Sequence, residues 1–465
     1  MAQNLKARLS QIRDTRKSAG AAGGSNAGIP VERRSGISEP VYAASAWPLW
    51  SEAGYMTLKR EITRELPFSL PVSLPASPPV SLPVSLPAVF PGALAILVPD
   101  FIRAGMIPSP AGIIFFDLET TGLSGGAGTL AFLAAFGRFV PSKKTNGNTL
   151  LKITQYLLLD YPGENDFVEN LVKEFAPLSA PLPASLPEPG LCGLPFVVSY
   201  NGKSFDSQIL NNRCLMNGIP VPGYFHADLL HPSRRLWKRM LPDCSQSTIE
   251  VSALGLDRTG DVPGSLAPEI WFSFLKTGDN RELLSVCEHN AKDILGLASI
   301  FLVLGETAKE PFKSGKRFCL DEEALALSWR KAVKKNPAFF GNDESCRNCA
   351  ETGRLLLESA ARNGFKRAAF TLALEHFKNG RVQDGRALMR EIAEDEPPAA
   401  GASSTVSNSL RAAARKSLAI DAEWRLNDPS LALQYTDSAL ALAGISTRLR
   451  KELEMRRSRL EEKIK

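Results

Sequence analysis

The chain has 465 residues, of which 44% are hydrophobic and 22% charged, and its formal net charge is +6. This length predicts two or three domains, each able to bury a core. Seven widely spaced cysteines argue against a secreted disulfide framework. The first residues are basic with no apolar region behind them, so we do not expect a signal peptide, and without a run of about eighteen apolar residues a membrane span is not expected. We expect a soluble, cytoplasmic protein, and the basic charge weakly favours a polyanionic partner.

The chain begins with a basic N-terminal segment, residues 1–67, that we expect to be partly flexible. A short basic helix and a Gly/Ala/Ser tether are predicted over 1–30, and a candidate strand near 55–66. Residues 68–92 carry a degenerate Ser-Leu-Pro repeat. Because proline lacks an amide donor and fixes φ, this segment is predicted to be an extended low-complexity linker. A proline-rich ligand for a partner domain is the alternative.

Residues 93–304 have the pattern of an α/β domain. Strands are predicted at 113–117, 129–139, 150–160 and 196–200, and helices at 165–175 and 205–216. Strands that alternate with helices in this way indicate a mixed sheet flanked by helices. A second proline-rich stretch, 177–190, is predicted to be an insertion between ordered elements.

Residues 320–465 contain helical segments and no predicted strand. Breaks at Asn336-Pro337, Gly364, Asn379-Gly380 and Asp428-Pro429 separate them. The stretch 368–395 predicts two short amphipathic helices, with small residues at Ala373, Gly385 and Ala387 where helices would pack closely. This loosely resembles a tetratricopeptide hairpin. A plain helical bundle is the alternative.

The most informative motif is IIFFDLETTG, in which Asp117 and Glu119 end a predicted buried strand. Side chains two residues apart share one face of a strand, so both carboxylates point to the same place. At about 4 Å and an effective dielectric of about 20 they would repel by roughly 4 kcal/mol. A divalent cation with a preference for oxygen ligands, Mg²⁺ or Mn²⁺, would remove that repulsion. The alternative is an exposed acidic strand end without a role.

Two further motifs place acidic residues near the same region. In NGKSFD, Asp206 follows a predicted strand and lies near the start of a helix, where a capping role is the alternative. In EHNAKD, His289 and Asp293 are four residues apart and therefore share one helical face.

Together these three motifs resemble those of the DEDDh branch of the ribonuclease-H-like 3′→5′ exonucleases. The segments SYNGKSFD, HADLLHPSRRLWKRM, DVPGSLAPEIW and EHNAKDILGLA further resemble the YprB-like ribonuclease-H-like proteins of bacteria. The similarity covers about residues 113–304, and the helical C-terminus also fits. The resemblance implies a ribonuclease-H-like exonuclease domain followed by an all-α, tetratricopeptide-like domain, with the proline-rich insertions as departures.

The resemblance implies a site with two cations, Mg²⁺ or Mn²⁺, held by Asp117, Glu119, Asp206 and Asp293. His289 would take a proton from the attacking water, a task suited to a group that titrates near neutrality. The implied reaction hydrolyses the last phosphodiester of single-stranded DNA or RNA and releases nucleoside 5′-monophosphates. We expect deletion of 69–91 to leave this activity intact.

Substrate contacts are predicted from the polar and basic residues near these motifs. Thr121 and Asn201 are candidate helpers, and Lys203 is placed to reach a phosphate. The segment SRRLWKRM puts Arg234, Arg235, Lys238 and Arg239 around Trp237, which would suit phosphate tracking and base stacking. The alternative is a solvated basic helix face with Trp237 in the core.

Three alternatives concern other ligands and functions. A zinc site at His226, Asp228 and His231, or at the CxxC pair Cys346 and Cys349, would lack a complete ligand set. A noncatalytic nucleic-acid-binding adaptor would recruit a protein partner through the helical repeats, but its usual sign, a missing carboxylate, is not seen. An endonuclease is disfavoured by the HxxxD motif.

Overall fold

The computed structural model describes residues 47–66, 90–104, 112–122, 128–141, 149–176, 194–336, 344–395 and 407–465, apart from the side chains of 90–93 and 344–347. The predicted N-terminal basic helix and tether, nearly all of the Ser-Leu-Pro linker and the insertion at 177–190 lie outside these ranges. So does the side chain of Cys346.

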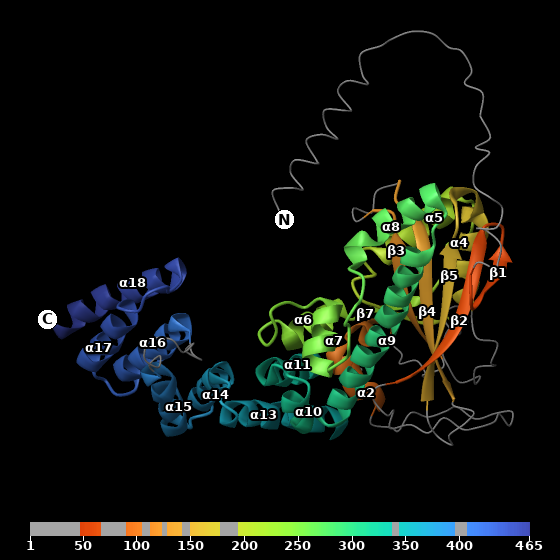
Figure 1. Ribbon diagram of the computed structural model, residues 1–465. Helices are drawn as coiled ribbons and strands as arrows, with labels where there is room; N and C mark the ends of the chain where they lie inside the picture. Colours follow the sequence, from red (N-terminus) through yellow and green to blue (C-terminus); the bar gives the residue numbers. More distant parts are fainter. Residues whose placement is uncertain are drawn as a thin grey trace, which may run out of the picture. The chain divides into compact units, whose positions relative to one another are not determined.

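A seven-stranded mixed sheet forms the centre of the first part of the chain (Figure 1). Its spatial order is β1-β2-β5-β4-β3-β6-β7. The pairs from β1 to β3 are antiparallel, whereas β3, β6 and β7 run parallel. The strands are β1 (Trp50–Gly54), β2 (Thr57–Glu65), β3 (Ile113–Thr120), β4 (Ala131–Pro141), β5 (Thr149–Leu158), β6 (Phe196–Ser199) and β7 (Phe225–Asp228).

The predicted α/β sheet is therefore confirmed, but it takes in more of the chain than residues 93–304. The candidate strand near 55–66 is β2, which pairs with β5 along its whole length, from Thr57 opposite Leu158 to Glu65 opposite Leu150. Within the segment expected to be a partly flexible N-terminus, Trp50–Gly54 and Thr57–Glu65 are thus strands of the sheet.

Helices cover both faces of the sheet. The long helix α9 (Arg281–Lys309) contacts β3, β4 and β5 on one face. On the other face, Phe116 and Phe136 pack edge-on against Phe175, which directly follows α4 (Glu164–Glu174). Phe115, one residue away from Phe116 on β3, instead meets Phe301 of α9. This alternation fixes which β3 side chains face α9, namely Phe115 and the odd-numbered residues after it.

This part contains further helices, several of which pack on α9 or on one another. They are α2 (Phe90–Leu97), α3 (Asp100–Ala104), α5 (Asp206–Met216), α6 (Leu230–Trp237), α7 (Gln246–Leu254), α8 (Ala267–Thr277) and α10 (Pro311–Arg317), with short 3-10 turns η4 (Tyr161–Gly163) and η5 (Gly264–Leu266). In the described part of the chain, no helix combines the length and apolar character that a membrane span requires.

The C-terminal part is helical, as predicted, and each helix packs against the next one along the chain. The helices are α11 (Glu322–Lys335), α13 (Glu344–Arg362), α14 (Lys366–Lys378), α15 (Val382–Glu394), α16 (Asn408–Trp424), α17 (Pro429–Leu440) and α18 (Thr447–Ile464). Sequential pairing is the arrangement of a helical array. It differs from a bundle, in which distant helices share one core.

The predicted close packing of small residues is confirmed at two of three positions. A Cβ on Gly385 of α15 would lie 3.1 Å from the Ala373 carbonyl oxygen of α14, so a side chain here would push the two helices slightly apart. Ala373 is fully buried. The prediction is wrong for Ala387, which is exposed, because it lies on the face of α15 turned away from α14.

The core of the sheet part continues into the first helices of the C-terminal part. One cluster of buried side chains joins Phe115 of β3, Ile294 of α9, Trp329 of α11 and Leu357 of α13. Separate clusters hold α14 to α16 and α16 to α18.

Candidate active site

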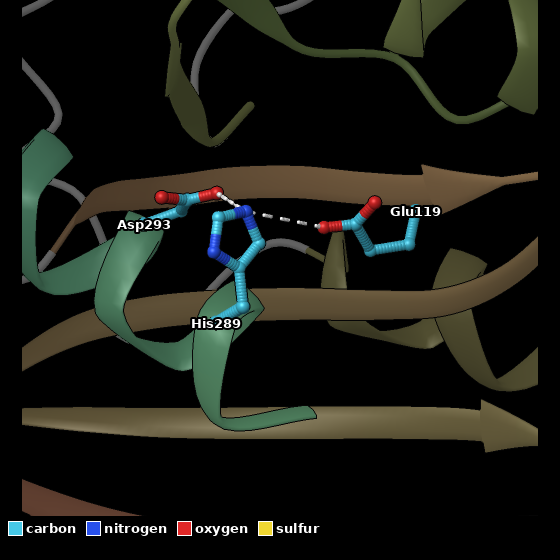
Figure 2. Close-up of side chains that lie close together, drawn as sticks. All are labelled: Glu119, His289 and Asp293. Carbon is cyan, nitrogen blue, oxygen red and sulfur yellow. Dashed lines mark ion pairs between the residues drawn. The ribbon is translucent and has the colours of Figure 1, made fainter. Parts of the chain in front are cut away.

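The site forms where the end of β3 faces α9. Asp117 and Glu119 share the face of β3 that carries Phe115, so they point toward α9. Opposite them, α9 presents His289 and Asp293, one helical turn apart. Figure 2 shows the His289 ring between the carboxylates of Asp293 and Glu119. The HxxxD spacing and the DxE motif thus bring together the residues that the sequence predicted.

The distances are those of a shared ligand site. His289 Nε2 lies 3.3 Å from Asp293 Oδ2 and 4.0 Å from Glu119 Oε1. Among the described residues, these three form the one group of His, Cys, Asp or Glu side chains whose ligand atoms all lie within 4.8 Å. No such group forms at His226, Asp228 and His231, so the alternative of a zinc site there gains no support.

Asp117 and Asp206 are electrostatically part of the same site. Burial, followed by the charges of Asp293, Asp206 and Glu119, holds the pKa of Asp117 well above its usual value. Burial, and then Asp293, Asp206 and Asp261, likewise raise the pKa of Glu119. Burial and the charge of Asp228 raise the pKa of Asp206 to about 8. Burial and nearby negative charges therefore make ionisation of Asp117, Glu119 and Asp206 unfavourable.

Such a donor set fits divalent cations. Clustered carboxylates, buried and mutually repelling, are stabilised as anions when hard cations with oxygen preference bind among them. Hydrogen bonds and positive charge from the protein offset only part of the repulsion among these carboxylates. Asn290 Nδ2 donates to Asp117 Oδ2 at 2.8 Å, and Arg258 Nη2 donates to Asp293 Oδ1 at 2.5 Å.

A loop residue that the sequence analysis did not single out orients the histidine. Asp261, between α7 and α8, lies 3.0 Å from His289 Nδ1 and accepts its hydrogen. Burial tends to raise the pKa of Asp261, but hydrogen bonds and charges from Arg258 and His289 outweigh it, so the pKa is lowered and the group is ionised. With Nδ1 as the donor, Nε2 is the nitrogen left to accept a proton on the site side.

Arg258 joins this loop to the site. Its guanidinium contacts Glu250 Oε2 at 2.5 Å, Asp261 Oδ2 at 2.7 Å and Asp293 Oδ1 at 2.5 Å. Gln246 adds a bond from its side-chain amide to the Asp293 carbonyl oxygen. In the sequence, neither Asp261 nor Arg258 has a spacing that sets it apart from surface charges.

A chain of buried hydrogen bonds, which we call the polar relay, ends at Asp117 and supports it. Asn290 of α9, which donates to Asp117, accepts at Oδ1 from Gln155 Nε2 of β5 at 2.9 Å. Gln155 Oε1 accepts in turn from Arg60 Nε of β2 at 3.0 Å. Asn290 and Gln155 have no exposed surface, and Arg60 is 5% exposed. In the sequence, only Asn290 pointed to this relay, because it is a polar residue within the HxxxD motif.

Asp206 begins α5, and a tight turn positions it. Asn201 has φ +66°, a left-handed conformation that asparagine tolerates. A Cβ on Gly202 would lie 2.8 Å from Asp206 Oδ2 and 2.5 Å from Ser199 Oγ, so this position requires glycine. Asp228 holds the turn by accepting from the backbone amides of Asn201 and Lys203. Asp228 therefore has a structural role in this turn.

The predicted helpers have structural roles in this conformation. Thr121 Oγ1 accepts from the Leu130 amide at 3.0 Å, which closes the β3–β4 connection. Asn201 contributes through its backbone amide, and Lys203 Nζ pairs with Asp100 Oδ1 at 2.6 Å. Their predicted contacts with substrate remain predictions.

The basic segment 233–240 divides between core and surface. Trp237 is fully buried and donates from Nε1 to the Phe318 carbonyl oxygen at 2.9 Å, so it is a core residue and cannot stack on a base. Arg234, Arg235 and Lys238 are exposed to solvent. The alternative of a solvated basic face with Trp237 in the core is correct for the tryptophan.

Comparison with known proteins agrees with this architecture. Residues 114–304 match the family model of the RNase_H superfamily. The chain is 28% identical over 356 residues to the uncharacterized protein YprB of Bacillus subtilis, a match that covers 76% of this chain and 75% of that protein. The sheet domain that carries Asp117, Glu119, His289 and Asp293 is therefore similar in sequence to the RNase_H superfamily, and a helical region follows it.

Proposed function

We propose that this protein is a metal-dependent 3′→5′ exonuclease that hydrolyses single-stranded nucleic acid and releases nucleoside 5′-monophosphates. The observation that carries the proposal is the meeting of His289 and Asp293 with Glu119, beside the carboxyl of Asp117, whose pKa the charge of Asp206 helps to raise. The ribonuclease H superfamily match supports a nuclease. The histidine of the HxxxD motif supports the exonuclease branch.

Asp117, Glu119, Asp206 and Asp293 are the residues that would hold two divalent cations, Mg²⁺ or Mn²⁺. When bound, such cations activate water and neutralise negative charge on a phosphate. The raised pKa values of Asp117, Glu119 and Asp206 support this assignment, since they show carboxylates that lack sufficient positive compensation from the protein.

His289 is the proposed general base. Its Nδ1 is held by Asp261, and its Nε2 faces the space between Asp293 and Glu119, where a water that attacks the terminal phosphodiester would lie. Gly264 lies against the ring, since a Cβ there would be 3.1 Å from Nε2. Loop 261–264 thus both orients the imidazole and leaves room beside it.

Linear and circular single-stranded DNA, compared in Mg²⁺ and in Mn²⁺, test the exonuclease assignment. We expect the wild type to degrade the linear strand to mononucleotides and leave the circle intact. His289→Ala should lose most of the activity, whereas His231→Ala, at an exposed histidine in α6, should not. Cleavage of the circle would indicate an endonuclease. Tight binding without any hydrolysis would favour the adaptor.

A further inference from the structure

The structure contains a second concave site, away from the carboxylates, whose walls are basic. It is a pocket of about 580 Å³ between α2 and α3 on one side and α6 and α11 on the other. These elements lie together in Figure 1, where α2, α6 and α11 meet beside the C-terminal half of α9. Its volume is within the range of small-ligand sites, which is roughly 300–1,000 Å³.

The charged side chains that line this pocket are all cationic. Five cationic side chains line it, and the described lining includes no carboxylate: the five are Arg103, Arg235, Arg239, Lys331 and Lys335. Arg103 pairs with Asp100, and Arg239 pairs with Asp321 and Glu323. Within the described chain, no ion pair is formed by Arg235, Lys331 or Lys335.

Arg235 lines the pocket without a charged partner among the described residues. Its side chain is accessible to solvent, yet the surrounding protein desolvates it enough to lower its pKa. Its hydrogen bond, from Nη1 to the Leu97 carbonyl oxygen, is long at 3.4 Å. A guanidinium that is partly desolvated and has no anionic partner is stabilised when an anion binds beside it.

The floor of the pocket is apolar. Ile96 of α2 and Ala332 of α11 are buried there, and Ile102 and Leu327 are half-buried. On α11, Leu327, Lys331 and Lys335 follow each other at four-residue intervals, so they share one face. An apolar floor with cations around it suits a ligand that combines an aromatic ring with phosphate.

We propose that this pocket binds a nucleotide unit, with the phosphate against Arg235, Lys331 and Lys335 and the base on the apolar floor. The unit can belong to a strand of nucleic acid or be a free mononucleotide, because both present the same chemistry. The pocket shares no residue with the carboxylate site, so this proposal stands independently of the proposed exonuclease.

Binding in EDTA, where the proposed hydrolysis cannot proceed, separates the two proposals. Fluorescence anisotropy would follow a labelled single-stranded oligonucleotide, and calorimetry would follow AMP. The variants are Lys331→Glu, Lys335→Glu and Arg235→Gln in the full-length chain. The matched control is Lys334→Glu, which makes the same charge change on the same helix at an exposed residue outside the pocket.

We expect each pocket variant to weaken binding about tenfold and to reduce the dependence of affinity on salt, while Lys334→Glu changes it less than about twofold. Loss of oligonucleotide binding identifies a strand as the ligand, and loss of AMP binding alone identifies a free nucleotide. Equal effects of Lys331→Glu and Lys334→Glu, or no binding of either ligand by the folded wild type, would overturn the proposal. Circular dichroism melts would verify that the variants are folded.

Discussion

The hydrogen bond between Asp261 and His289 determines which imidazole nitrogen faces the carboxylates. Asp261→Ala removes the acceptor for Nδ1, so the ring is free to rotate and to change its tautomer. We expect kcat to fall by about 10- to 100-fold with KM nearly unchanged, as for other groups that orient a catalytic side chain.

The matched control for Asp261 is Asp257→Ala, an exposed carboxylate in the same loop that contacts Thr259. It should keep wild-type kcat. Asp261→Asn, which retains an oxygen acceptor, should recover part of the lost rate. An Asp261→Ala enzyme with wild-type kcat would show that His289 needs no orienting partner.

The raised carboxyl pKa values also predict how stability depends on pH. Asp206, with a pKa of about 8 in the folded protein, binds its proton more tightly there than in the unfolded chain, where the value is near 3.8. The folded state therefore holds more protons between these pH values. The contribution of Asp206 to the free energy of unfolding of the metal-free protein therefore falls as pH rises through this window.

Asp206→Asn replaces the carboxyl with a group that does not ionise, so it should remove the part of this decrease in stability that Asp206 contributes. We expect the metal-free variant to be more stable than the wild type at pH 8, on the order of a few kcal/mol, and equal to it near pH 4. Urea denaturation in EDTA measures this difference, and Asp384→Asn, at an exposed carboxylate in α15, is the control. Mg²⁺ should stabilise the wild type more than Asp206→Asn. A variant that is less stable at pH 8 would contradict the electrostatic description.

At the scale of elements, β2 and β5 support the site through a buried relay. Gln155→Ala removes the acceptor for Arg60 and the donor to Asn290, and so leaves buried polar groups unpaired. We expect a loss of about 2–3 kcal/mol in the free energy of unfolding, together with reduced activity because Asn290 no longer holds Asp117 in one orientation.

Gln208→Ala, at an exposed glutamine of α5, is the control for Gln155→Ala and should change stability by less than about 0.5 kcal/mol. Thermal and urea melts of the three proteins measure the effect. An unchanged melting curve for Gln155→Ala would show that the relay contributes nothing to stability.

The elements also show what can be predicted from the sequence. Apolar runs identified β3 to β6, and the DxE motif placed two carboxylates on one face because strand geometry fixes that relation locally. The four-residue spacing of His289 and Asp293 likewise placed both side chains on one face of a helix. Arg60 and Gln155 could not be found in this way. Their strands carry polar residues on both faces, and only the approach of α9 decides which of these become buried.

At the scale of the molecule, the helical region is continuous with the sheet domain. The boundary predicted between residues 304 and 320 falls within one core, because Phe318, Trp329 and Leu357 pack in the same cluster as Phe115 and Trp237. A chain that ends at residue 310 would expose this cluster. We expect it to aggregate or to melt at a much lower temperature than the full chain.

A chain that ends at residue 427 removes α17 and α18, and so disturbs their clusters with α16 and the packing of Tyr435 against the α14–α16 cluster, but leaves the sheet cluster intact. Its main thermal transition should stay close to that of the full chain. Scanning calorimetry of the two truncated proteins would compare them. A well-folded protein ending at residue 310 would show that the sheet domain is independent after all, as the predicted domain boundary implied.

The central claim is that Asp117, Glu119, Asp206, His289 and Asp293 form a metal-dependent exonuclease site. A time course on 5′-labelled single-stranded DNA and RNA, in Mg²⁺, Mn²⁺ or EDTA, tests it most directly. The prediction is a ladder that shortens from the 3′ end, requires metal, disappears with Asp117→Asn and is strongly slowed by His289→Ala. Intact strands at all times with the folded wild type, in either metal, would contradict it.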